Sequence, residues 1–527
     1  MCDDTLEVIT FTVSDVSRKL AALDVSSSMG PDGMHPMLLK SCPVLAHPIT
    51  EISEASMNEG RVLCCWGISE VVPIFKKGSR SLPLNYRPIS LTSILCKVME
   101  RIVVEQMYDY LERNSVLSDD QFGFRRGRTV DDQLLLTYDY VTLSLDSGDV
   151  IDLVLFDFSK AFDVVNHDVL LTKLWCLGIR GRLWHWIDSF LRGRKMYVSV
   201  GGAHSSCQDV TSGVPQGSVL GPLLFLFFVN LLPSFLICKC KIFADDLKLY
   251  LRISTSSLVS LAVGLSSCQR DIDTICSVAS SWGLELNRDK CVVLRFQRGV
   301  VPWPLVGALS SYSLQGQLLP LVPSHKDLGV LVDTTLKFHQ HIRSIVNKAS
   351  GMSASLLKST LCRSVHFMLT LYIAHIRPLL EFASCLWNTG YVGDLKLLES
   401  VQRNWTRHID GLSELTYEER LQHLDLYSVQ GRLLRADLIK YWKIFHGECG
   451  VRSGDLFVMA PDVGTRGHRF KILHSHSNIE VRRRFFSLRC VSLWNSLPDE
   501  VVALNSLQSF KSALHRQLGH LLYQFAN

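Results

Sequence analysis

Two adjacent carboxylates, Asp245 and Asp246, lie between short segments in which polar and apolar residues alternate, 239–242 before the pair and 247–251 after it. This alternation predicts two strands joined as a hairpin, with the pair at its tip. Adjacent carboxylates repel each other and resist desolvation, so an apolar hairpin accommodates them where solvent or a cation compensates the charge. For the pair alone, a solvated turn is the simpler interpretation. Three other Asp-Asp pairs lie in polar, loop-like stretches, at 3–4, 119–120 and 131–132.

A third carboxylate upstream changes that interpretation. Residues 150–156 form a short apolar run, rich in β-branched residues, that ends at Asp157 as a central buried strand ends at a site. The separation from Asp245, 245 − 157 = 88 residues, leaves room for helices and a hairpin between two neighbouring strands of one sheet. Three carboxylates could then converge on hard divalent cations such as Mg²⁺, which prefer oxygen ligands.

Length and composition set wider limits. With 527 residues, 47% of them hydrophobic, the chain can form several domains with large cores. Lys and Arg exceed Asp and Glu by 55 − 50 = 5, so net charge permits a nucleic-acid partner without requiring one. The 16 cysteines include no Cys-x-x-Cys or zinc-finger spacing, which indicates reduced thiols in a cytosolic or nuclear protein. The acidic start at Asp3 and Asp4 argues against an export signal.

One strongly apolar segment, 221–233, resembles a membrane span in hydropathy. The prolines at its two ends leave 232 − 222 = 10 residues between them, whereas a spanning helix needs about 20. We therefore predict a buried helix that begins at Pro222 and packs beneath the sheet, and we expect no membrane partner.

Basic residues near the start of the chain could hold phosphates. After a helical region over 1–60, a strand at 68–75, a basic turn at 76–80 and a second extended segment at 85–91 form a predicted flap, followed by a helix over 93–113. The flap carries Lys76, Lys77 and Arg87. Cationic side chains on such a flap suit phosphate binding, although a solvated hairpin tip explains them as well.

Two glycine-containing loops are candidates for contact with a ligand. The loop 121–128 combines aromatic residues and glycines with Arg125, Arg126 and Arg128, a composition that suits a phosphodiester backbone; an exposed basic loop is the alternative. The loop 213–218 feeds the buried helix and carries Gln216 and Gly217, which could approach a ligand closely, or could simply connect a strand to a helix.

The sequence pattern of the C-terminal part predicts an all-helical module. Helices are predicted over about 337–358, 366–387 with a kink before Pro378, 394–410 and 428–446. In the less regular tail, arginines at 482–484 lie beside aromatic residues, which suits single-stranded nucleic acid or a solvated helix face with a buried aromatic side.

Taken in order, these motifs resemble those of reverse transcriptases, and most closely the polymerase of LINE-type (non-long-terminal-repeat, jockey-like) retrotransposons. The resemblance covers nearly the whole chain. It rests on Asn-Tyr-Arg-Pro-Ile-Ser-Leu at 85–91, Gln-Phe-Gly-Phe-Arg at 121–125, Phe-Ser-Lys-Ala-Phe-Asp at 158–163, Gly-Val-Pro-Gln-Gly-Ser at 213–218, Phe-Ala-Asp-Asp at 243–246 and Trp-Asn-Ser-Leu-Pro at 494–498.

The resemblance implies an α+β fold, a right-hand polymerase with fingers, a palm in which an antiparallel sheet packs on helices, and a helical thumb, plus a C-terminal helical or irregular extension. The implied parts are an N-terminal helical extension, fingers, a palm with the catalytic carboxylates, thumb and C-terminal extension, at 1–60, 61–150, 151–335, 336–447 and 448–527. The implied reaction is addition of deoxynucleotides to a primer 3′-hydroxyl on an RNA template.

Roles for single residues also follow from the resemblance. Asp157, Asp245 and Asp246 would hold two Mg²⁺ ions, or Mn²⁺, and Lys290 would protonate the departing pyrophosphate. Phe162 would lie under the sugar and exclude a 2′-hydroxyl. Lys76 or Lys77 with Arg87 would bind the triphosphate, and the loop with Gln216 and Gly217 would touch the incoming sugar or the template. A core aromatic residue and a turn lysine are the structural alternatives for Phe162 and Lys290.

Two rival interpretations remain. One is a catalytically silent or truncated retroelement relic that binds RNA, against which the intact carboxylates argue; the other is a group II intron maturase-like protein, against which the C-terminal third argues. The first 60 residues cannot contain the endonuclease that such elements usually carry, and no RNase H or integrase signature is found. We therefore expect endonuclease activity to come from elsewhere, and a cytoplasmic or nuclear location.

Overall fold

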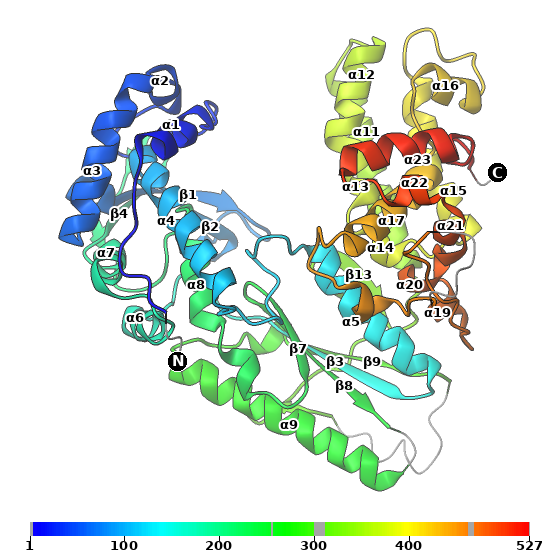
Figure 1. Ribbon diagram of the computed structural model, residues 1–527, viewed down its shortest axis with the longest axis horizontal. Coiled ribbons are helices and arrows are strands. Elements are labelled where there is room, and N and C mark those ends of the chain that lie inside the picture. The colour runs from blue at the N-terminus through cyan, green and yellow to red at the C-terminus, as the bar shows by residue number, and fades with distance from the viewer. Residues whose placement is uncertain (1–3, 255–256, 300–310, 462–467, 526–527) are drawn as a thin grey trace.

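The computed structural model describes residues 4–254, 257–299, 311–461 and 468–525, and it shows mixed helices and sheets (Figure 1). An antiparallel sheet, in which the structure describes four strands in the order β7-β8-β3-β9, lies in the lower part of the view. Its strands are β3 (Val150–Phe156), β7 (Lys239–Phe243), β8 (Asp246–Ile253) and β9 (Val292–Phe296). The predicted strand at 150–156 and the predicted hairpin around Asp245–Asp246 are confirmed.

Strand β3 is buried on both faces of this sheet. Val150, Val154 and Phe156 face a core made with helices on one side, and Ile151, Leu153 and Leu155 face a second core on the other. The first core contains α6 (His167–Cys176), α8 (Gly221–Val229) and α9 (Leu258–Ser281); the second contains α5 (Val130–Asp146) and the C-terminal helices. A strand buried on both faces is mostly apolar, which explains the run that the sequence shows; its one charged residue, Asp152, is paired with Arg295.

A second sheet stands beside the N-terminal helices, in the order β2-β1-β4-β5, with β6 also paired to β4. The β1–β2 pair is antiparallel and the β1–β4 pair is parallel. Its strands are β1 (Ile68–Phe75), β2 (Tyr86–Leu91), β4 (Lys195–Val200), β5 (Ala203–His204) and β6 (Gln208–Asp209). The surrounding helices are α1 (Val13–Ala21), α2 (Pro36–Ser41), α3 (Ala46–Glu59), α4 (Ile94–Arg113) and α7 (Gly181–Leu191).

The predicted apolar helix at 221–233 is helix α8, which starts at Gly221 with Pro222 in its first turn and is buried. Proline suits this position because the first-turn N–H would have no partner within the helix. No helix within the described ranges combines the length and the apolar character needed to cross a membrane.

The C-terminal half is helical, as the sequence predicts, and lies to the right in Figure 1. Two small hairpins precede it, β10 (Ser313–Leu314) with β11 (Gln317–Leu318), and β12 (Ser324–Asp327) with β13 (Val330–Asp333). Its helices are α11 (His339–Ser359), α12 (Val365–Leu371), α13 (Arg377–Glu381), α14 (Ser384–Trp387), α15 (Val392–Arg407), α16 (Tyr417–His423), α17 (Val429–Phe445), α18 (Ser453–Leu456), α19 (Glu480–Arg483), α20 (Phe486–Arg489), α21 (Val491–Ser496), α22 (Asp499–Val502) and α23 (Leu507–Leu522).

The predicted kink before Pro378 is confirmed, but the prediction that the helix continues to residue 387 is wrong. After α12 the chain makes a π-helical turn at Tyr372–Ile376, continues as α13, and breaks where Ala383 has a positive φ of 53°. Pro378 has no N–H to donate and so cannot close a regular turn, and the left-handed residue reverses the chain before α14.

The prediction that Asp131–Asp132 lies in a loop is also wrong, because the pair forms the first turn of α5. The Thr129 side chain accepts a hydrogen bond from the backbone N–H of Asp132, and the Asp132 carboxylate accepts one from the N–H of Thr129 at 2.8 Å. Carboxylates in the first turn compensate the positive end of the helix dipole. The carboxylate of Asp132 is fully buried and forms an ion pair with Lys440 of α17.

Two arginines of the tail have a structural role. Arg482 donates to the buried carboxylate of Asp139 at 2.6 Å, and Arg489 forms an ion pair at 2.7 Å with Asp437 of α17. Arg483 is exposed, and Arg484 pairs with Glu480 at 2.7 Å, so nucleic-acid binding by these two stays a prediction. The described residues from 450 onward share one core with the helices that precede them, and ion pairs connect the two. The predicted domain boundaries themselves stay predictions.

We expect Asp437→Asn to destabilise the helical half by about 3–5 kcal/mol, because it leaves the Arg489 guanidinium buried without a counter-charge. Urea unfolding followed by tryptophan fluorescence measures the change. Glu418→Gln, at an exposed carboxylate of α16, is the control and should stay within about 0.5 kcal/mol of the unsubstituted chain. Equal losses from both substitutions would contradict the structural role of the buried pair.

Candidate active site

The register of β3 and β8 brings the three predicted carboxylates to one end of the sheet. The two strands pair antiparallel as far as Phe156 opposite Leu247, so Asp157 and Asp246 are the next residues on each side. Asp245 lies in the turn that joins β7 to β8. Asp157 and Asp246 line one pocket of about 370 Å³, together with Lys290 and His325. The expectation that residues 88 positions apart lie on neighbouring strands is therefore confirmed.

Negative charge accumulates at this end of the sheet. Burial, together with the charges of Asp245 and Asp327, raises the pKa of Asp246 to about 6. Burial also raises the pKa of Asp245; the charge of Asp157 adds to this, and the charges of Lys76 and Arg87 oppose it. Carboxylates that disfavour each other's ionisation in this way are the electrostatic setting in which a cation binds.

Lys290 reaches the same carboxylates from a separate loop. The segment 284–290 docks on the end of β3, where the N–H of Asn287 donates to the carbonyl of Asp157 and the N–H of Ser159 donates to the carbonyl of Glu285, both at 2.8 Å. This docking places the Lys290 ammonium 2.5 Å from Oδ2 of Asp157. The predicted catalytic lysine therefore lies at the predicted site as the ion-pair partner of its first carboxylate.

The donor set suits a magnesium ion in chemical kind. Asp157, Asp245 and Asp246 offer only oxygen ligands, and burial first, then neighbouring carboxylates, raise the pKa values of the last two, which a nearby cation would oppose. Within the described ranges, no three His, Cys, Asp or Glu side chains lie close enough together to bind a metal ion as they stand. The Lys290 ammonium contacts Asp157 in the position that a cation could take.

The loop at 121–123 supports the turn that carries Asp245. The N–H of Phe122 donates to the carbonyl of Ile242 at 2.8 Å, so the loop runs along the free edge of β7. A Cβ atom on Gly123 would lie 2.3 Å from the backbone nitrogen of Ala244, so the close approach requires glycine. Ala244 itself has a positive φ of 57°. The glycine of the predicted ligand-binding loop thus positions the carboxylate turn.

Phe162 and the 213–218 loop form one unit beside the carboxylates. The half-buried ring of Phe162 stacks on Phe225 of α8 with ring centroids 4.2 Å apart. The loop is anchored to this segment by the Val214 N–H, which donates to the carbonyl of Phe162, and by the Gln216 side chain, which donates to Asp163 at 2.7 Å. The carbonyl of Gln216 accepts from the N–H of Ser90 in β2, and a Cβ atom on Gly217 would lie 2.2 Å from the carbonyl oxygen of Ser90.

The predicted phosphate-binding residues come from β1, β2 and their connection. Lys76 and Arg87 lie near enough to Asp245 to lower its pKa. Lys77 is exposed on the same turn, and among the described residues we find no ion pair for it. The structure thus brings Lys76 and Arg87 to the carboxylates and leaves Lys77 at the periphery.

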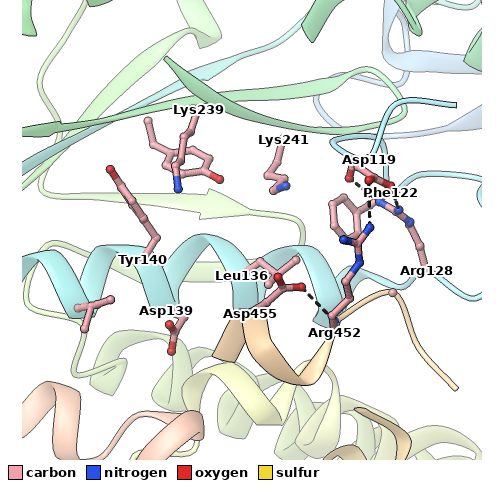
Figure 2. A pocket seen from close by; sticks show the side chains of 13 residues that line it. Asp119, Phe122, Arg128, Leu136, Asp139, Tyr140, Lys239, Lys241, Arg452 and Asp455 are labelled. Carbon is pink, nitrogen blue, oxygen red and sulfur yellow. Dashed lines mark hydrogen bonds and ion pairs between the residues drawn. The ribbon is translucent and has the colours of Figure 1, made fainter. Parts of the chain in front are cut away.

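The three arginines of the 121–128 loop are held by carboxylates, and Figure 2 shows one of them. Arg128 pairs with Asp119 at 2.7 Å and lies over the ring of Phe122, in a pocket of about 400 Å³ that Arg452 of the C-terminal part also lines. Arg125 pairs with Glu112 and is largely buried, whereas the half-exposed Arg126 pairs with Asp109. Their binding of nucleic acid stays a prediction.

One group beside the site was missed in the sequence. Lys248, in the middle of β8, is fully buried and pairs at 2.7 Å with the buried Asp327 of β12, which also accepts a hydrogen bond from the Tyr138 hydroxyl of α5. Lys248 opposes the rise in the pKa of Asp246, and Asp327 adds to it. The signal was a lysine between leucines in an apolar strand, since a buried lysine requires an acidic partner.

Comparisons with known proteins agree with this geometry. The family model described as "Reverse transcriptase (RNA-dependent DNA polymerase)" matches residues 74–367, more than half of the chain. The chain is similar to "RNA-directed DNA polymerase from mobile element jockey" of Drosophila melanogaster, 25% identical over 77% of this chain and 44% of the relative. The protein of the same name from Drosophila funebris is 28% identical over 65% of this chain and 37% of the relative. The chain thus spans less than half the length of these curated relatives.

Among solved structures, an apo telomerase from Candida Tropicalis, truncated from its C-terminal domain, is similar with a TM-score of 0.36 and 12% identity. That similarity covers 55% of this chain and 59% of the telomerase chain. At this score we base no argument on it.

The carboxylates should destabilise the protein when no divalent cation is present. The pKa of Asp246 in the folded protein, about 6, lies above its ordinary value of 3.8, so the folded protein binds more protons than the unfolded chain between about pH 4 and pH 6. The free energy of unfolding therefore falls as the pH rises through this window. At pH 7.5 in EDTA, we expect Asp246→Asn to raise the free energy of unfolding by about 1 kcal/mol, a value that already includes solvent screening. At pH 4 the substitution should raise it little. Thermal unfolding at both pH values measures this. Glu54→Gln on α3 is the control, and an equal gain there would contradict the electrostatic cause.

Proposed function

We propose, since the chain belongs to the reverse transcriptase (RNA-dependent DNA polymerase) family, that it extends the 3′-hydroxyl of a primer with deoxynucleotides along an RNA template, as the polymerase of a LINE-type retrotransposon. The observation that carries this proposal is that Asp157 and Asp246 follow one another across paired strands, with Asp245 in the adjoining β7–β8 turn. The α+β fold, with an antiparallel sheet packed on helices and a helical part behind it, is the right-hand polymerase fold of this family.

Reverse transcriptases depend on divalent cations, and in this chain Asp157, Asp245 and Asp246 would hold two Mg²⁺ ions. Bound there, the ions would activate the primer hydroxyl and neutralise the triphosphate charge of the incoming nucleotide. The raised pKa values of Asp245 and Asp246 support this assignment, because a bound cation would stabilise the ionised form of carboxylates that burial and neighbouring carboxylates disfavour.

Three further residues are placed to select and orient the nucleotide. Lys76 and Arg87 face Asp245 from the neighbouring sheet, where their charges suit the triphosphate, and Arg87 can bind it through two hydrogen bonds at once. Phe162 lies on Phe225, which fixes its ring against movement, so a ribose 2′-hydroxyl above it would meet a rigid surface.

The 213–218 loop serves this nucleotide pocket mainly through its backbone. The side-chain amide of Gln216 donates a hydrogen bond to Asp163, and its backbone carbonyl accepts one from the N–H of Ser90. The loop therefore fixes the distance between the segment of Phe162 and β2. Gly217 permits that contact, and the exposed edge of the loop is left for the template or the sugar.

Lys290 has a role in two charge states of the site. Its ammonium compensates the charge of Asp157 in the absence of other cations, and it would be available to donate a proton to the leaving pyrophosphate once Asp157 is otherwise neutralised. The partners implied by the family are an RNA template, a primer and deoxynucleoside triphosphates.

Primer extension on an RNA template tests the function directly. We expect the chain to extend a labelled primer in Mg²⁺, and the double variant Asp245→Asn/Asp246→Asn to lose activity at least about 1,000-fold, because the remaining carboxylate cannot hold the ions. Denaturing gels measure the product, and RNA binding by both proteins is the control. Equal background extension by both, with RNA binding intact, would leave a binding protein without synthesis.

The role of Phe162 can be tested by the choice of sugar. We expect Phe162→Ala to raise the incorporation of ribonucleotides relative to deoxynucleotides by at least about tenfold, because the substitution removes the surface that a 2′-hydroxyl would meet. Single-nucleotide kinetics with both sugars measure this ratio. Phe235→Ala, at an exposed aromatic residue outside the site, should leave the ratio unchanged. An unchanged ratio in Phe162→Ala would assign this ring to the core alone.

A further inference from the structure

A groove between α17 and α23 carries positive charge without a counter-charge. Its open volume is about 470 Å³. The residues that line it are basic or polar and surround Tyr427: Arg435, Gln508, Lys511, Ser512, His515 and Arg516. No carboxylate of the described residues lines it. The site of nucleotide addition does not use this groove, because α23 lies well apart from β7 and β8 in Figure 1.

The cations of the groove lack acidic partners. Within the described chain, Arg435, Lys511 and Arg516 form no ion pair, and Nε of Arg435 is buried without a hydrogen-bond partner. The nearby carboxylates are occupied, since Asp425 accepts a hydrogen bond from Tyr523 and Glu381 pairs with Arg432 at 2.7 Å. Burial lowers the pKa of Arg435; Tyr427 and Glu381 oppose this, and the charge of Arg377 adds to it. Repulsion between like charges raises the free energy of the folded protein, and an anionic ligand bound between them would lower it.

The groove has a fixed shape. The hydroxyl of Tyr427 and Nδ1 of His515 are 2.5 Å apart and hydrogen bonded, and the Arg435 guanidinium lies 5.8 Å from the centre of the Tyr427 ring. The end of α23 is anchored by the Ser428 N–H, which donates to the carbonyl of Leu522. A Cβ atom on Gly431 would lie 2.0 Å from that same carbonyl oxygen, so glycine permits the close approach of the two helices.

The exposed face of α23 follows a regular pattern. The lining residues 508, 511, 512, 515 and 516 have helical spacing, whereas Phe510, Leu514 and Leu518 on the opposite face are buried. From residue 508 to residue 516 the helix rises by 516 − 508 = 8 steps, or about 12 Å along its axis. It offers amide, hydroxyl and cationic donors in a row, which suits several oxygens of one extended anion rather than a single small ion.

We propose that this groove binds the phosphodiester backbone of a nucleic acid strand, at a distance from the site of nucleotide addition. The choice of nucleic acid over another polyanion rests on the proposed polymerase function. Lys511 and Arg516 are the principal contacts, with Arg435 at the floor of the groove. The C-terminal extension would thereby hold a part of the template or of its duplex that the catalytic pocket does not reach.

The test compares binding of nucleic acid by the full chain and by Lys511→Gln/Arg516→Gln. Glutamine keeps the helix propensity and removes only charge. Fluorescence anisotropy with a labelled, unstructured 40-nucleotide RNA, from about 50 to 200 mM salt, gives the affinity and its salt dependence. We expect affinity to fall about tenfold at the lowest salt, and the slope of log K against log salt to become shallower by about 1.4, since two phosphate contacts on a single strand are lost.

A matched control removes the same two charge types elsewhere. Lys396 and Arg407 are exposed on α15, form no ion pair among the described residues and do not line the groove. Lys396→Gln/Arg407→Gln should keep the affinity and the slope of the unsubstituted chain. Thermal unfolding of all three proteins should agree to within a few degrees, which shows that the helices remain folded.

The outcomes separate the two proposals. Parallel titrations with an RNA–DNA heteroduplex and with duplex DNA identify the kind of nucleic acid that the groove binds. The natural ligand is the probe for which the groove variant loses the most affinity relative to the control variant. Equal affinities and slopes for the groove variant and the control variant with all three probes would overturn the inference. Primer extension by the unsubstituted chain is scored separately, so an inactive chain with a selective loss of binding would refute the polymerase and leave the groove assignment standing.

Discussion

The burial of β3 on both faces is the constraint on which the rest of the structure depends. Its alternate residues enter two separate cores, so the strand cannot slip by one residue without moving every side chain to the wrong core. Its single internal charge, Asp152, is matched by Arg295 at 2.7 Å and by the Tyr312 hydroxyl. The fixed register of β3 against β8 then determines where Asp157 emerges, directly beside Asp246. The position of the candidate site thus follows from the packing of a strand whose own side chains take no part in chemistry.

The same end of the sheet concentrates negative charge in a partly exposed pocket. Asp245 and Asp246 disfavour each other's ionisation, and the chain compensates them only in part, with Lys290 against Asp157 and Lys76 and Arg87 across from Asp245. A fully compensated cluster would be more stable and would bind cations more weakly. The buried pair of Lys248 and Asp327 lies on the same face of β8 as Asp246, lines the same pocket, and connects β8 to the β12–β13 hairpin. The incomplete compensation at the tip is the feature that favours an external cation.

Local pattern was sufficient for the parts of the fold in which each residue's environment is set by its neighbours in sequence. The strand at 68–75, the strand ending at Asp157 and the helix starting at Pro222 were all predictable, because alternation, apolar runs and first-turn proline are local signals. The long-range partners were not. The Asp132 carboxylate pairs with Lys440, 308 residues away, and no feature of the sequence near Asp132 specifies that partner. The break at Ala383 also depends on packing, since alanine usually favours a helix.

The buried arginines of the C-terminal part show why pattern alone left their role open and why the groove differs. Arg482 and Arg489 lie beside aromatic residues in the sequence, as a nucleic-acid surface would, yet each ends on a buried carboxylate of another segment. The chain therefore supplies an acidic partner where it buries a cation for structure. Arg435, Lys511 and Arg516 are in the same module, and no described carboxylate pairs with them. Uncompensated charge of opposite sign thus occurs at two places, carboxylates at the strand tip and cations on α17 and α23. Metal-bound triphosphate suits the first and a phosphodiester strand suits the second, so a single complex of template, primer and incoming nucleotide would satisfy both.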